Sequence, residues 1–355
     1  MRSFDNQSNG ASSSKVEGVL DIFLSNPSLK QVLTQAAFSS KDAVIQASAI
    51  QVFTLILRQV LDDQNLDQNV MVLDVQKVYL LFEKSSKTEP FISIMCCALM
   101  SEMLRQDQQQ AAFILQKFSQ ANSLQIIKDL VDIKLPKKGN ISLVNGINFG
   151  CQHEGFYDHP ISFFSHVAEQ FFSDQRMSKE RKQEFLQTVA QIKLDEMLMH
   201  FLMNISSKSD LGPAGFIKML TFIHDAIQNE QKEFMQKIFK NCMKLLCSMM
   251  RDNQLLSIQE WPLKCGGGAE TTQNLIIIIL KIFNIPFNYQ IFDKEVNEIN
   301  AGLIKADIIY LMLNDLKCLA TESIPIGITL ILRLVFSAES SKQQFVQGNR
   351  LGIIN

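Results

Sequence analysis

The chain has 355 residues, with 34 Lys and Arg against 36 Asp and Glu, and 46% of its residues are hydrophobic. This apolar fraction excludes wholesale disorder, because it supplies enough side chains for a continuous core. The formal net charge of -2 gives no overall attraction to nucleic-acid phosphates or anionic lipid, so we expect neither nucleic acid nor a membrane as partner.

The first segment, residues 1–14, is polar and has no apolar stretch typical of a signal peptide. We predict a disordered tail here, a cytoplasmic chain, and helical repeats over residues 15–134. The first strongly periodic segment follows Lys41. Its apolar residues recur at helical spacing and predict one broad apolar face, made of Val44, Ile45, Ala49, Val52, Phe53, Ile56, Leu57 and Val60.

The same three- and four-residue spacing of apolar side chains continues along the chain. It predicts further helices over residues 69–82, 90–104, 108–118, 123–133, 161–172, 184–203, 215–227, 232–250, 271–283, 302–319 and 324–336. Pro27, Pro90, Pro213 and Pro286 mark expected boundaries, because proline cannot continue a helical hydrogen-bond ladder. A second set of helical repeats is therefore expected over residues 161–355.

Small residues occur at corresponding places in two of these helices. They are Ala47, Ser48 and Ala49 in one helix and Cys96, Cys97 and Ala98 about one repeat length downstream. Small side chains let stacked helices approach closely, as in armadillo and HEAT repeats. We expect an all-α, armadillo/HEAT-like α-solenoid whose C-terminal end, near residue 355, is uncapped.

Residues 135–160 interrupt the helical pattern. Asn145 and Gly146 stand between two β-prone runs, which is typical of a tight hairpin turn. A long insertion of this kind in a compact array is commonly functional. We therefore expect a loop insertion with a β-hairpin, and we take as candidate partner-binding residues Asn145, Gly146, Phe149, Phe156, Tyr157 and the single tryptophan, Trp261.

Two apolar segments, residues 274–283 and 324–336, are too short to cross a bilayer and are expected to be buried helices. The seven cysteines mostly fall within apolar helical patterns, which predicts free thiols in a reducing compartment.

No pattern of catalytic or metal-binding residues is complete. Cys151, His153, His159 and His166 lack the spacing of a zinc site, and a polar loop with one helical histidine explains them better. The glycine triplet after Cys265 is not followed by the lysine and Ser/Thr of a phosphate loop. We expect no enzyme activity, no metal and no cofactor.

The segment WPLKCGGGAETTQNLIIIILKIFNIPF, residues 261–287, resembles a stretch in the C-terminal helical region of Fused-family serine/threonine kinases. The shared features are a Trp-Pro pair, a glycine triplet, an apolar helix and a following Pro-Phe. In that family the helical array is linked to ciliary axonemes and to the central pair of microtubules. This chain has no kinase domain, so the resemblance implies a structural role and not phosphotransfer.

These observations lead to one expected function and one alternative. The first is a non-catalytic protein-interaction scaffold, a structural component of the ciliary axoneme or central apparatus, with other proteins of a larger assembly, microtubule-associated ones among them, as partners. The alternative is a regulatory subunit that acts in trans on a kinase or a small GTPase.

Overall fold

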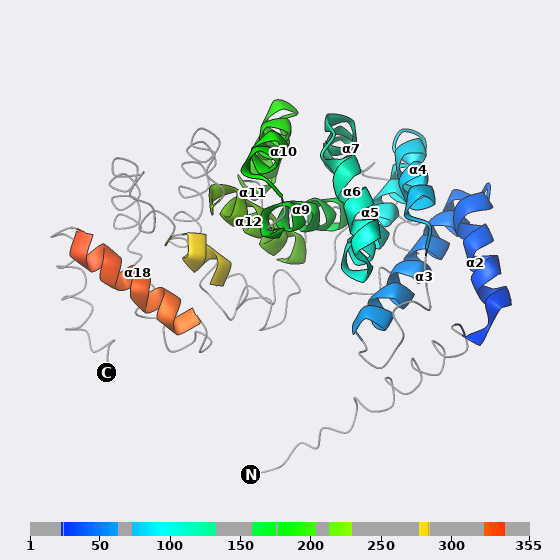
Figure 1. The fold of residues 1–355 in the computed structure, drawn as a ribbon, viewed down its shortest axis with the longest axis horizontal. Helices are drawn as coiled ribbons and strands as arrows, with labels where there is room; N and C mark the ends of the chain where they lie inside the picture. Colours follow the sequence, from blue (N-terminus) through cyan, green and yellow to red (C-terminus); the bar gives the residue numbers. More distant parts are fainter. Residues whose placement is uncertain are drawn as a thin grey trace, which may run out of the picture. The chain divides into compact units, whose positions relative to one another are not determined.

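A computed structural model describes residues 23, 25–62, 73–132, 158–174, 177–203, 213–228, 277–282, 284 and 323–337. Helices are the only regular secondary structure in these residues, so the all-α class is confirmed for them (Figure 1). The chain divides into two compact units, the first made of Met1–Gln116 and Lys134–Gly150 and the second of Lys117–Ile133 and Cys151–Asn355. We describe each unit by itself.

The first unit contains five described helices. Four of them end before Gln116, and the fifth ends two residues beyond it. They are α2 (Pro27–Ser39), α3 (Ala43–Asp62), α4 (Val75–Ser85), α5 (Pro90–Gln106) and α6 (Gln108–Phe118). The helices predicted over 90–104 and 108–118 are confirmed, as is the one after Lys41. Helix α2 was not among the predicted helices.

Polar side chains fix where the helices of this unit begin. The Asn26 side chain accepts hydrogen bonds from the backbone N–H groups of Ser28 and Leu29 at the start of α2. The Asp42 carboxylate accepts from Val44 N at 2.8 Å and Ile45 N at 3.1 Å at the start of α3. These bonds satisfy backbone donors that have no partner within the helix.

Helix α5 forms the centre of the first unit. Every residue from Ile92 to Leu104 is buried, and both α3 and α4 pack against it. The small residues predicted to allow close approach are buried here: Ala47 and Ala49 in α3, and Cys96, Cys97 and Ala98 in α5. Helix α2 packs on α3.

The second unit contains α7 (Ala121–Asp132), α9 (Asp158–Ser173), α10 (Lys179–Gln191), α11 (Leu194–Met203), α12 (Pro213–Gln228) and α18 (Ser323–Ser337). Helix α7, placed by the sequence with the N-terminal repeats, packs on α9, α10 and α11 of this unit. The predicted loop 135–160 is described only at its end, where α9 begins at Asp158.

Phenylalanine rings form the core of the second unit. Phe185 of α10 stacks on Phe171 of α9 at a centroid distance of 4.5 Å, and Phe164 of α9 meets Phe222 of α12 at 4.7 Å. Such pairs add to the stabilisation from burial alone. The hydroxyl of Ser165 donates a 2.7 Å hydrogen bond to the carbonyl of Lys218, which ties α9 to α12.

The single helix predicted over residues 184–203 is wrong, because the structure has two helices there. Helix α10 ends at Gln191, and Lys193 adopts a positive φ of 58° before α11 begins at Leu194. The backbone N–H groups of Ile192 and Lys193 donate to carbonyls of the preceding turn. The apolar spacing runs through both helices, so the pattern alone gave no sign of the break.

The helices predicted over 232–250 and 302–319 lie outside the described residues, as do the tail 1–14 and residues 338–355.

Candidate interaction surfaces

None of the candidate partner-binding residues predicted from the sequence is described. Asn145, Gly146, Phe149, Phe156, Tyr157 and Trp261 all lie outside the described residues, so those predictions stay predictions. Cys151, His153 and Cys265 lie outside them too. His159 and His166 belong to α9, and within the described part of the chain no group of three or more His, Cys, Asp or Glu could hold a metal ion.

The two described cysteines have no exposed thiol. Cys96 and Cys97 are fully buried in α5, and both are free. Burial raises the pKa of each thiol well above its usual range, because a thiolate would lose its hydration there. Since the thiolate is the nucleophilic form, these two residues serve the core and not a reaction.

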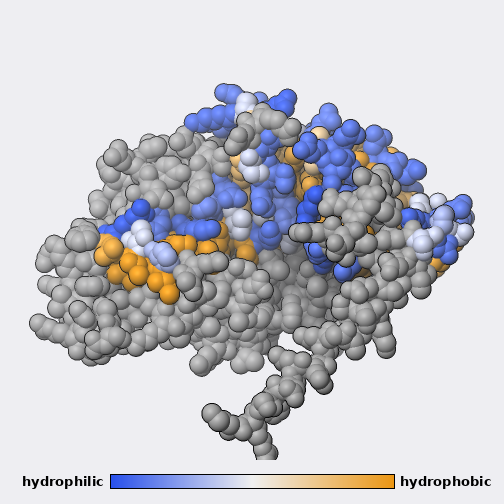
Figure 2. Space-filling view, turned by 60° about the horizontal axis from the view of Figure 1, so that its bottom comes forward, coloured by the Kyte–Doolittle hydropathy of each residue, from blue (hydrophilic) through white to orange (hydrophobic). Residues whose placement is uncertain are grey.

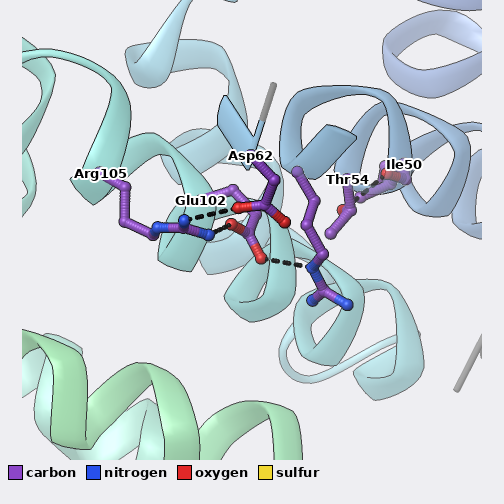
Figure 3. A network of polar contacts seen from close by, with 6 residues as sticks. Ile50, Thr54, Asp62, Glu102 and Arg105 are labelled. Atoms are coloured by element: carbon purple, nitrogen blue, oxygen red, sulfur yellow. Dashed lines mark hydrogen bonds and ion pairs between the residues drawn. The ribbon is translucent and has the colours of Figure 1, made fainter. Parts of the chain in front are cut away.

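A charged network links α3 to α5 in the first unit (Figure 3). The Glu102 carboxylate accepts hydrogen bonds from Arg58 Nε and from Arg105 Nη1, each at 2.8 Å. Arg105 Nη2 also donates to Asp62 Oδ1 at 2.8 Å. The hydrogen bond to Asp62 raises the pKa of Arg105, and Glu102 adds to this effect. The Glu102 side chain is only 7% exposed, so its charge requires these partners.

The described residues include eight exposed large hydrophobic side chains, and five of them lie on the neighbouring helices α2 and α3. They are Leu29, Val32, Ile45, Val52 and Leu55. Single exposed apolar residues are normal on a protein surface, but a concentration on two adjacent helices is typical of an interaction surface.

The exposed residues of α3 between Ile45 and Gln59 follow one line along the helix, which we call the α3 strip: Ile45, Val52, Leu55 and Gln59. Ile45, Val52 and Leu55 are 50%, 41% and 42% exposed. This corrects the predicted apolar face of α3, which included Ile45 and Val52. The buried face consists of Ala47, Ala49, Ile50, Phe53, Thr54, Leu57 and Val60.

The sequence of α3 contained an indication of the exposed α3 strip, but the helical spacing alone did not distinguish this strip from the buried face. Helix α3 has apolar residues on its exposed side as well as on its buried side, whereas a helix packed on one side of a globular protein has a polar outer face. It is the one described helix long and apolar enough to cross a membrane, although 39% of that stretch is buried. Its packing on α5 and the Arg58–Glu102 ion pair are typical of a core helix.

Helix α18 presents a second apolar surface, which Figure 2 shows in orange at the left of the view. Ile328 and Leu332 are exposed one turn apart, while Leu330 and Ile331 are buried. On the inner side, the Asn284 side chain donates to the carbonyl of Ile326 at 3.3 Å and accepts from Arg333 Nη1 at 3.1 Å. This contact gives a polar partner to Arg333, which is the one charged residue of α18.

Comparison with protein-family models, with curated proteins and with solved structures finds no match to this chain. The candidate surfaces therefore rest on the geometry described above.

Proposed function

We propose that the chain is a non-catalytic protein-interaction scaffold whose helices stack as an armadillo- or HEAT-like solenoid. In the first unit, the hairpin α2–α3 and the hairpin α4–α5 each pack internally, and α3 also packs on α5. Contact between the second helices of successive hairpins is how solenoid repeats stack. This pattern supports the solenoid for the described part of the first unit.

The observation that carries the interaction role is the apolar surface of α2 and α3. Val32 is 63% exposed and Leu29 lies one turn before it, while only Ala37 of α2 is fully buried. Amphipathic helices of partner proteins bind to apolar surfaces of this kind. Such a surface needs no reactive group, and its apolar area contributes roughly 25 cal/mol to binding for each Å² removed from water.

We further propose that this scaffold works in a microtubule-based assembly of the cilium. The support is the resemblance of residues 261–287 to the helical region of Fused-family kinases, together with the helical architecture of the described residues. Its partners would be other proteins of the axoneme or central apparatus.

Proximity labelling in the native cell tests this function. The wild-type chain is compared with Leu29→Lys plus Val32→Lys, and with Leu80→Lys as a matched control, because Leu80 of α4 is also exposed, at 60%. Axonemal neighbours that are lost with the α2 variant and kept with the control would support the proposal. Neighbours dominated by one kinase or small GTPase would favour a regulatory subunit acting in trans, and an unchanged list of soluble transport proteins would contradict both.

A further inference from the structure

We draw no further inference here: the strongest candidate, the exposed apolar surface that the α3 strip forms together with Leu29 and Val32 of α2, carries none because nothing in the described part of the chain shows what covers it.

Discussion

At the scale of single residues, the buried charge of Glu102 is the feature that the sequence could not reveal. Arg58 lies 44 positions before it, and the two meet only because α3 packs on α5. The sequence did indicate the buried cysteines, since Cys96 and Cys97 fall in an apolar helical pattern. Burial follows from local composition, whereas an ion pair depends on which helices become neighbours.

Glu102→Gln should loosen the first unit. The glutamine keeps the size of the side chain but removes the charge that pairs with Arg58 and Arg105. We expect the free energy of unfolding of the first unit to fall by about 2 kcal/mol. Hydrogen–deuterium exchange of peptides from α3 and α5 would measure it as faster exchange.

Asp62→Asn is the control for this change, because Asp62 is exposed and contacts only the outer side of the same network. Its effect should stay below about 1 kcal/mol. Equal effects of the two substitutions would contradict the role given to Glu102.

Cys96 and Cys97 should resist alkylation in the folded chain. Both are fully buried, and burial raises the pKa of each thiol, so the reactive thiolate is scarce at neutral pH and unreachable. Peptide mass spectrometry after brief treatment with iodoacetamide should find them unmodified, and fully modified once the chain is denatured. Rapid modification without denaturant would show that α5 is not the closed centre of its unit.

At the scale of elements, most helices could be predicted because the apolar spacing records which face is buried. The spacing does not record where a helix is interrupted. The break between α10 and α11 depends on Lys193, which has a positive φ. The spacing of apolar residues carries no information about this backbone conformation. The helix α2 was missed because only Ala37 is fully buried in it, so its apolar spacing is weak.

Lys193→Gly should stabilise the second unit by about 0.5–1 kcal/mol, because glycine adopts a left-handed conformation without the steric cost of a Cβ. Lys193→Val should have the opposite effect, since a β-branched residue is least tolerated there. Urea denaturation followed by circular dichroism would compare the three chains. A valine variant as stable as wild type would indicate that α10 and α11 are continuous in solution.

Phe185→Ala should cost the second unit about 3–5 kcal/mol, because the ring is buried and its removal leaves a cavity beside Phe164 and Phe171. Limited proteolysis within α10 would report the loosening. Phe172→Ala is the control, since that ring is only half-buried and meets Phe185 at 6.2 Å. The control should be clearly less sensitive to protease.

At the scale of the whole molecule, the chain consists of two compact units, and the substitutions above are assigned to different ones. Composition gave no sign of the division at Gln116, because it falls within the last turn of α6, where the sequence has no proline or glycine. The assignment of α7 follows from contacts: α7 packs on α9, α10 and α11, which come after it in the chain.

Glu102→Gln and Phe185→Ala should therefore act independently. Exchange should rise in α3 and α5 for the first variant and in α9 and α10 for the second, and the double variant should show the sum of both. Faster exchange throughout the chain from either single change would mean that the two units unfold together.

The sequence by itself determined the helical class, the approximate bounds of most described helices and the small buried residues of α3 and α5. It could do so because burial on one side of a helix imposes a period of 3.6 residues on the chain. Only the tertiary structure decided that Ile45, Val52 and Leu55 are exposed, that Glu102 lies between two arginines, and that α7 belongs with the second unit. Helix α3 has apolar residues on two opposite sides, so its neighbouring helices determine which side is buried.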